Sequence, residues 1–99
     1  MSSQRPMPVA LDLLGRRWAL RLVWELRRDV AGFSELRERT GISPSVLATR
    51  LRELGEAGVI ERDDARRYRL SGHGRELARL LYEINRWAET ADPGSRRVR

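Results

Sequence analysis

The sequence predicts a mainly α-helical domain with a small two-stranded β-sheet, the arrangement of a winged helix-turn-helix. Three observations support this fold class. Two segments with helical spacing of apolar residues flank a short turn at residues 40–43, two β-prone segments follow at residues 59–62 and 67–70, and a long amphipathic segment comes last. Helix, short turn, helix and hairpin in this order form a helix-turn-helix with a wing.

The first part of the chain predicts two helices. Residues 9–14 are mostly apolar and end at Gly15, which indicates a brief helix, and residues 16–28 predict a second one. The second helix is apolar over more than half of its circumference, because Leu20 and Trp24 lie outside its main apolar sector. A helix of this kind is packed on two sides, so we expect its second side to meet another subunit.

The helix-turn-helix itself carries clear boundary signals. Ser34 is the predicted N-cap of a helix that ends at residue 40. Ser43 followed by Pro44 opens the next helix, because proline is favoured at the first helical position. That second helix is expected to run to about residue 57, where Gly58 ends it.

A hairpin and a long helix complete the predicted domain. Residues 63–66 form a tight polar turn between the two strands, and Ser71 is the predicted N-cap of a helix over residues 74–91. The apolar stripe of that helix comprises Leu77, Leu80, Leu81, Ile84, Trp87 and Ala88. Arginines occupy its opposite side, so the helix is amphipathic.

Length and charge limit the domain count and the partners. A chain of 99 residues suits one domain, expected over residues 7–91 between a flexible arm (residues 1–6) and a flexible basic tail (residues 92–99). Its 20 basic residues are all arginine and outnumber 14 acidic residues, which gives a net charge of +6. This balance favours a polyanionic partner, nucleic acid before an anionic membrane.

Several functions are excluded by what the sequence lacks. Without cysteine the chain has no disulfide, no thiolate metal site and no thiol redox chemistry. His73 is the only histidine, and no paired carboxylates, catalytic triad or phosphate-binding loop occur, so we expect no enzyme activity, no metal and no other cofactor. No apolar run approaches the roughly 18 residues of a membrane span and no signal peptide is recognisable, so we expect a soluble cytoplasmic protein without membrane contact.

The helix after the turn has two unlike faces. Its core face carries Leu47, Leu51 and Leu54, and its opposite face carries Ser45, Thr49 and Arg52. A helix that enters the major groove of DNA presents slim polar side chains to the base edges. The second set is therefore the predicted base-reading surface, and the alternative is a plain solvated face.

Further residues are predicted to contact the DNA backbone. Ser43 and Ser45 lie at the helix N-terminus, where free backbone N–H groups favour phosphate, and Arg50 lies on the flank of the same helix. Arg66 ends the hairpin turn and Arg67 begins the second strand, and both are expected to contact the backbone or the minor groove. The alternative for the hairpin is a solvated tip that is partly neutralised by its two aspartates.

The three tryptophans are candidates for packing or for a ligand pocket. Trp18 and Trp87 lie on apolar stripes, for which packing in the core or in a dimer is the favoured interpretation. Trp24 is the one that packing explains least, and it is the candidate for contact with a small-molecule effector. The sequence does not name such an effector.

Four stretches carry a family resemblance: MPVALDLLGRRWAL, GFSELRERTGISPSVLATRLREL, GEAGVIER and LSGHGRELARLLYEINRWAE. Together they span residues 7–89 in the right order and spacing, and they resemble the HxlR family of small bacterial winged-helix transcriptional regulators, which is related to the MarR group. The chain departs from the family pattern in a shorter wing. It also has Met7 where several members carry a sensing cysteine, so thiol sensing is excluded.

The resemblance implies a homodimer held by the terminal helices, with two recognition helices in successive major grooves of double-stranded DNA. The residues expected at the dimer contact are Leu11, Leu14, Leu20, Trp24, Leu77, Leu81, Ile84 and Trp87. We expect a nucleoid-associated regulator that binds an inverted-repeat operator, with repression the commoner mode of the family. The alternatives are a winged-helix protein–protein interaction module and a sensor gated by a ligand in a hydrophobic pocket at the dimer interface.

Overall fold

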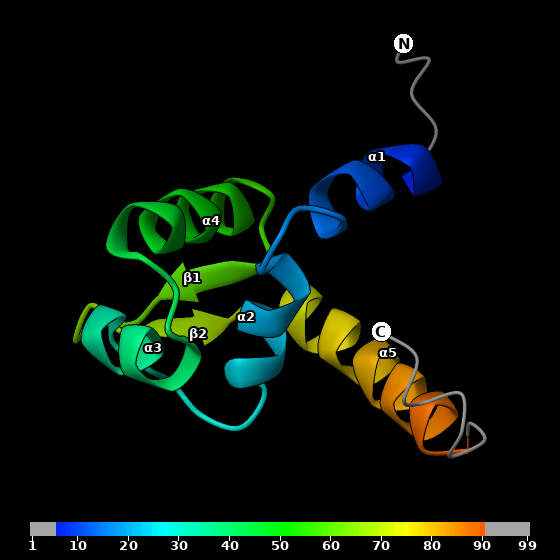
Figure 1. The fold of residues 1–99 in the computed structure, drawn as a ribbon. Coiled ribbons are helices and arrows are strands. Elements are labelled where there is room, and N and C mark those ends of the chain that lie inside the picture. The colour runs from blue at the N-terminus through cyan, green and yellow to red at the C-terminus, as the bar shows by residue number, and fades with distance from the viewer. Residues whose placement is uncertain (1–5, 91–99) are drawn as a thin grey trace, which may run out of the picture.

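The computed structural model describes residues 6–90 of the chain. In chain order its elements are α1 (Pro6–Leu14), α2 (Ala19–Glu25), α3 (Phe33–Thr40), α4 (Pro44–Glu56), β1 (Ile60–Arg62), β2 (Tyr68–Leu70) and α5 (Gly72–Glu89). Figure 1 shows α3, α4 and the sheet at one end of the molecule, while α1 and α5 extend from the other. This is the predicted winged helix-turn-helix.

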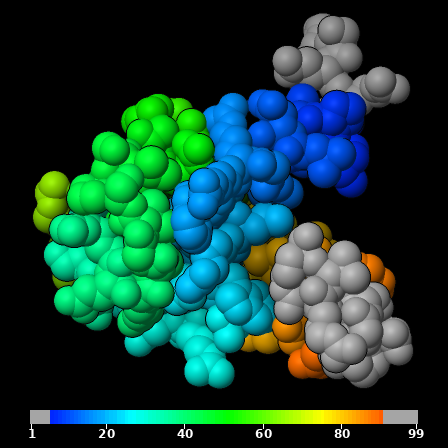
Figure 2. All heavy atoms as spheres, in the orientation of Figure 1, coloured from blue at the N-terminus to red at the C-terminus, as the bar shows by residue number. Residues whose placement is uncertain are grey.

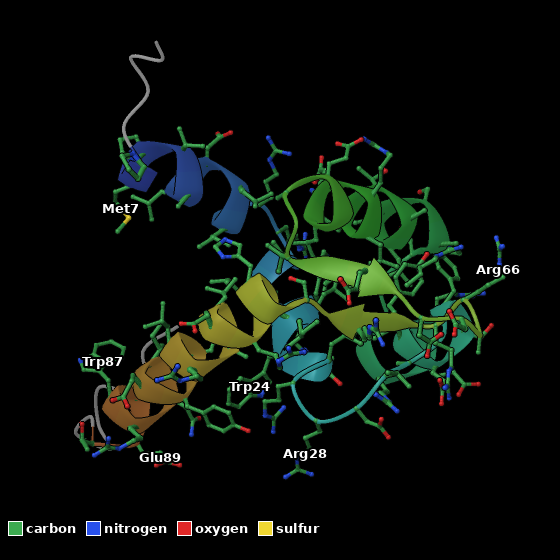
Figure 3. All side chains as sticks on the ribbon, turned by 180° about the vertical axis from the view of Figure 1, so that it is seen from behind. Met7, Trp24, Arg28, Arg66, Trp87 and Glu89 are labelled. Carbon is green, nitrogen blue, oxygen red and sulfur yellow. The ribbon has the colours of Figure 1, made fainter. Side chains whose placement is uncertain are left out.

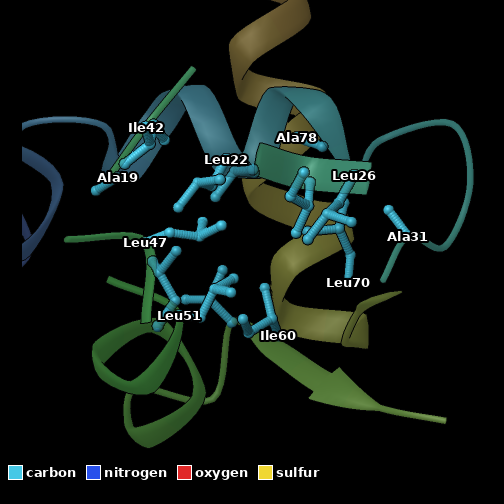
Figure 4. Close-up of a cluster of buried hydrophobic side chains, with 14 of the residues drawn as sticks. Ala19, Leu22, Leu26, Ala31, Ile42, Leu47, Leu51, Ile60, Leu70 and Ala78 are labelled. Atoms are coloured by element: carbon cyan, nitrogen blue, oxygen red, sulfur yellow. The ribbon is translucent and has the colours of Figure 1, made fainter. Parts of the chain in front are cut away.

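The core fixes the orientation of α4. The largest fully buried side chains are Leu22 and Val23 of α2, Leu36 of α3, and Leu47 and Leu54 of α4 (Figure 4). Burying each such side chain stabilises the fold by about 1.5–3 kcal/mol. Because side chains of α2 and α3 pack against the leucines of α4 in the same cluster, α4 is fixed with its opposite face toward solvent.

The β-hairpin is tied to the loop before α3. Strands β1 and β2 are antiparallel, with Ile60 opposite Leu70 and Arg62 opposite Tyr68. Ala31 adds a β-bridge, because its N–H donates to the Tyr68 carbonyl at 3.0 Å and its carbonyl accepts the Tyr68 N–H at 2.8 Å. Strand β2 therefore pairs with β1 on one side and with Ala31 on the other.

Helix α2 is shorter than predicted. It covers Ala19–Glu25 instead of residues 16–28, and Trp18 before it has a positive φ of 77°. A positive φ cannot continue a helix, so residues 15–18 form a turn that separates α1 from α2. Helix α1 in turn begins at Pro6, earlier than the predicted residue 9, so Pro6 is helical and not part of the expected arm.

The N-cap of α3 differs from the prediction. Ser34 lies inside the first turn, and Gly32 occupies the cap position. The Gly32 N–H donates to Glu35 Oε1 at 2.7 Å, which satisfies a backbone donor at this end. This bond comes from a carboxylate three residues after the cap, and the expected cap by a serine hydroxyl is not formed.

The ends of α4 and α5 agree better with the sequence. Gly41 (φ 73°) and Gly58 (φ 78°) follow α3 and α4 in the left-handed conformation that glycine favours. Ser71 caps α5 as predicted, since its hydroxyl accepts the Gly74 N–H at 3.0 Å, although α5 begins at Gly72 and ends at Glu89. A Cβ on Gly74 would lie 2.0 Å from the Val59 carbonyl oxygen, so a glycine is required where the first turn of α5 approaches the residue before β1.

Helices α1 and α5 expose apolar side chains. The exposed large apolar residues of the described chain are Met7, Val9, Leu11, Leu80, Tyr82, Ile84 and Trp87, all from these two helices. Figure 2 shows α1 projecting from the rest of the molecule. Residues 6–90 contain no helix long and apolar enough to cross a membrane.

Candidate nucleic-acid interface

The exposed face of α4 is the one that its spacing predicts. Ser45 and Arg52 are exposed and Thr49 is half-buried between them, whereas the leucines of the opposite face are buried. Arg52 Nη1 lies 3.6 Å from Glu56 Oε2, and both side chains are more than half exposed (59% and 68%). This pair is weak enough for Arg52 to exchange Glu56 for a DNA partner.

The N-terminus of α4 is open to solvent. Ser43 occupies the N-cap position, but its hydroxyl makes no capping hydrogen bond, and Pro44 is the first helical residue. Both residues and Ser45 are exposed. First-turn N–H groups without a side-chain cap are suited to a phosphate oxygen.

Arg50 does not lie on the exposed face. Its Nε donates to the Arg17 carbonyl at 2.8 Å, and its Nη1 lies 3.3 Å from Glu53 Oε1. The side chain is only 21% exposed. Arg50 thus joins α4 to the turn before α2, and in this conformation the expected phosphate contact is replaced by an internal one.

Glu53 connects the same turn to α4 a second time. Its Oε2 lies 2.9 Å from Arg16 Nη1, and Arg16 also reaches Asp12 Oδ2 at 3.3 Å. The hydrogen bond that Arg16 donates to Glu53, with a smaller contribution from Asp12, raises the pKa of the Arg16 guanidinium above its usual value. Spacing along α4 did not reveal this network, because the contacts of Glu53 with Arg16 and of Arg50 with Arg17 join residues more than thirty positions apart in sequence.

Asp63 organises the tip of the wing. Its Oδ1 accepts the N–H groups of Ala65 and Arg67, each at 2.9 Å, and its Oδ2 lies 3.2 Å from Arg67 Nη2. The backbone bond from Arg67, followed by its guanidinium charge, holds the pKa of this carboxyl below its usual value, against the opposing effect of burial. The carboxylate form of Asp63, which makes these contacts, is therefore favoured at neutral pH.

The two arginines of the wing turn differ in their freedom. Arg67 is paired with Asp63, whereas Arg66 has a φ of 67° and extends from the hairpin tip (Figure 3). Within residues 6–90 Arg66 has no ion-pair partner. Of the two predicted contacts, only Arg66 presents an uncompensated charge to solvent.

A hollow of about 520 Å³ separates α4 from the hairpin. It is lined by Ala48, Leu51, Arg52, Gly55, Ile60, Glu61, Arg62 and Tyr68. The Arg62 guanidinium stacks over the Tyr68 ring at 4.7 Å and donates to its hydroxyl. Sequence reasoning did not select these two residues for the site, although the pairing of the strands places them opposite each other.

The predicted dimer residues fall into three groups. Leu11, Ile84 and Trp87 are exposed (61%, 53% and 71%). Leu14, Leu20, Trp24 and Leu77 are half-buried, and all but Leu14 pack against the core. Leu81 is 8% exposed and belongs to the core of its own chain, so it is unsuited to the expected contact with a partner.

Trp24 has neighbours within its own chain. The Arg27 guanidinium lies 3.8 Å from the centre of its ring, and the Tyr82 ring of α5 meets it edge-on at 5.1 Å. The hollow beside it is lined by Glu25, Arg27, Arg28, Asp29 and Arg39 in addition to Trp24 itself. This lining is charged, unlike the hydrophobic pocket that was expected.

The apolar hollow of the structure lies elsewhere, between α1 and α5. It has a volume of about 910 Å³, and Met7, Val9, Leu13, Leu77 and Leu80 contribute to its wall. Of the exposed apolar residues of α1 and α5, Met7, Val9 and Leu80 line it. Among residues 6–90 no group of three or more histidine or acidic side chains is placed to hold a metal ion.

Comparison with known proteins places this geometry in a family. A model of the HxlR-like helix-turn-helix matches residues 13–95. The chain belongs to the HxlR-like helix-turn-helix family. It is accordingly a transcriptional regulator with a helix-turn-helix DNA-binding domain, and the resemblance seen in the sequence is confirmed.

Individual relatives agree with this assignment. The HTH-type regulator YvaP of Bacillus subtilis is 37% identical over 92 residues, which cover 85% of each chain. YodB of B. subtilis, in its quinone-bound crystal structure, superposes with a TM-score of 0.79 at 32% identity, covering 89% of this chain and all of that one. A protein of Enterococcus faecalis V583 assigned to the MarR family gives a TM-score of 0.75 at 29% identity, over 91% of this chain and 88% of that one.

Proposed function

We propose that this chain binds an inverted-repeat operator as a homodimer and represses transcription by occupying it, in the cytoplasm on the nucleoid. The observation that carries the proposal is the exposed face of α4, where Ser45, Thr49 and Arg52 stand beside the wing. Short polar side chains let a helix approach base edges closely, and Arg52 supplies a fork suited to guanine. Ser43 at the helix N-terminus and Arg66 in the wing contact phosphates.

The exposed apolar surface of α1 and α5 supports the dimer. Leu11, Leu80, Ile84 and Trp87 are each more than half exposed in a single chain. An apolar surface of this kind marks an interface, and the hollow between the two helices offers a place for a partner's side chains. Two-fold symmetry would then place two copies of α4 about 10 base pairs apart, one turn of DNA.

Fluorescence anisotropy tests the proposal. A labelled duplex selected from a random library is titrated with the full chain at two salt concentrations, beside a scrambled duplex of the same composition. The selected duplex should bind about 10³-fold or more tightly than the scrambled one, and both affinities should fall steeply with salt. Equal affinities would contradict sequence-specific recognition.

The same titration separates the alternatives. A winged-helix module that binds only proteins would show no salt-dependent affinity for either duplex. The exposed arginines of the wing and of α4 argue against that function. A ligand-gated sensor would bind DNA as proposed and differ only in responding to a small molecule.

A further inference from the structure

Arg27 occupies an unusual position between α2 and α5. Its guanidinium lies 3.8 Å from the ring centre of Trp24 and 5.8 Å from that of Tyr82, and the side chain is half-buried. Figure 3 shows Trp24 directed toward α5. Two aromatic rings thus hold one cation at the junction of the DNA-binding domain and the long helix.

This cation lacks an anionic partner. Arg27 Nη1 donates to the Trp24 carbonyl at 2.8 Å, but Nε is buried and has no acceptor. Within residues 6–90 no carboxylate forms an ion pair with Arg27. A partly desolvated guanidinium with a free donor is costly, and such groups are retained where an anion binds.

A hollow of about 520 Å³ opens beside Arg27. Its lining consists of Arg27, Leu70, Gly72, Arg75, Glu76, Ala78, Arg79 and Tyr82. Arg75 has no carboxylate partner in the described chain and donates only to the Leu70 carbonyl at 3.3 Å. Arg79 lies 3.7 Å from Glu76, and both side chains are more than 70% exposed, so that pair holds weakly.

This hollow is separate from the surfaces already assigned. None of its residues belongs to the exposed face of α4 or to the wing turn. On α5 the hollow is lined by Arg75, Arg79 and Tyr82, which share one side of the helix. The exposed apolar residues Leu80, Ile84 and Trp87 lie on another side. A ligand could occupy it while α4 is on DNA and the apolar surface is covered by a partner.

We propose that this hollow binds a small aromatic carboxylate. The carboxylate pairs with the guanidinium groups of Arg27 and Arg75, and the ring packs on Tyr82 above the apolar side chains of Leu70 and Ala78. Arginine binds carboxylates in a bidentate geometry, and the volume of the hollow is in the range of small-molecule sites. Arg27, the neighbour of Trp24, would then bind an anionic ligand, whereas the sequence led us to expect a hydrophobic effector near Trp24.

Isothermal titration calorimetry on the full chain without DNA tests this proposal, so its outcome is independent of operator binding. The probes are benzoate, 2-naphthoate, the uncharged benzamide and inorganic phosphate. We expect saturable binding of at least one aromatic acid with a Kd on the order of 1 mM or below, and none of benzamide or phosphate. Arg75→Gln should weaken binding about tenfold, because it removes one charged hydrogen-bond partner.

Arg86→Gln is the matched control, because Arg86 is an exposed arginine of the same helix outside the hollow and should leave binding unchanged. Arg27→Gln gives a second test, and circular dichroism checks that each variant is folded. If Arg27→Gln fails to fold, the affinity of Arg75→Gln for the aromatic acids is the deciding measurement. Absence of binding by both acids up to about 10 mM, equal binding of phosphate, or undiminished binding by Arg75→Gln would overturn the proposal.

Discussion

Arg52 and Arg66 have different surroundings, and the difference predicts different roles on DNA. Arg52 lies on α4 among short polar side chains, whereas Arg66 extends alone from the wing tip. A side chain that reads bases contributes to discrimination, and one that contacts phosphate contributes to affinity for any sequence.

Substitution of these residues separates the two roles. Arg52→Ala and Thr49→Ala should each weaken operator binding by about 1–3 kcal/mol while leaving random DNA nearly unaffected. Arg66→Ala should weaken both and lower the salt slope by about one. Arg86→Ala removes an arginine with a similar exposed pair from α5 and should change neither. Anisotropy titrations measure all four variants, and equal losses for both duplexes in Arg52→Ala would contradict the base-reading role.

Asp63 makes the order of the wing depend on pH. Its carboxyl has a lowered pKa because it accepts the Ala65 and Arg67 N–H groups. The stabilisation of the folded wing by the Asp63 carboxylate is therefore complete above about pH 4, where free aspartate is ionised. It is lost as the pH falls through the lower pKa that Asp63 has in the folded protein. NMR resonances of Ala65 and Arg67 should shift together in acid.

Substitution at the turn gives the corresponding control. Asp63→Asn should broaden or shift the same resonances at neutral pH, since the amide loses the charge that attracts Arg67. Asp64→Asn, at an exposed neighbour that makes none of these bonds, should leave them in place. An ordered turn in Asp63→Asn would show that the backbone of the tip needs no carboxylate.

At the scale of elements, α4 is held by core packing on one side and by an ion-pair network on another. Glu53 bonds to both Arg16 and Arg50, and Arg50 also donates to the Arg17 carbonyl. These contacts join the recognition helix to the turn that follows α1. The network therefore sets how α4 stands relative to α1, the helix expected at the dimer contact.

Loss of this network should reduce the discrimination between operator and random DNA more than it reduces the stability of the fold. Glu53→Gln is expected to lower operator affinity by about 1 kcal/mol, roughly fivefold, with random-DNA affinity nearly unchanged. Glu83→Gln is the control, because Glu83 is an exposed acid that pairs with Arg86 on α5, away from the proposed DNA-binding surface. A fall in melting temperature with an unchanged affinity ratio in Glu53→Gln would assign Glu53 to stability alone.

The elements also show what the sequence could predict. Helix α4 and its limits followed from Ser43, Pro44 and Gly58, because cap, proline and glycine signals are local in sequence. The positive φ of Trp18 and the cap at Gly32 depend on neighbours in space and on Glu35, so spacing alone misplaced the starts of α2 and α3.

The candidate site shows the same division between local and distant information. The exposed face of α4 followed from helical period, since the leucines mark the opposite side. The internal contact of Arg50 did not, because its partner Arg17 lies 33 positions earlier in the chain, in a turn that helical period does not place beside α4. Leu81 likewise shares a stripe with Ile84, and only the packing of α5 on α2 shows which of the two is covered by its own chain.

At the scale of the whole molecule, the exposed surface of α1 and α5 predicts that dimerisation and DNA binding are linked. Trp87→Glu places a charge on a side chain that is 71% exposed in one chain, so a single chain should still fold while the dimer is lost. Sedimentation should then give a monomer whose operator affinity falls by about 10²-fold or more, because one half-site remains in contact. Arg86→Glu places a carboxylate one residue away, on another side of α5, and changes the charge by two units instead of one, yet it should stay dimeric.

This variant replaces a change at Leu81, which is buried in the core of its own chain and would disturb the fold itself. Circular dichroism of Trp87→Glu shows whether the helices remain. A folded monomer that bound the operator as tightly as the unaltered protein would separate the two properties.

Hydroxyl-radical footprinting on the selected operator tests most directly whether two copies of α4 and the wing read a symmetric site. We expect two equivalent protected blocks on each strand, related by two-fold symmetry, with centres about 10 base pairs apart. The blocks should weaken together in Trp87→Glu. A single protected block, or even protection along the whole duplex, would contradict the account.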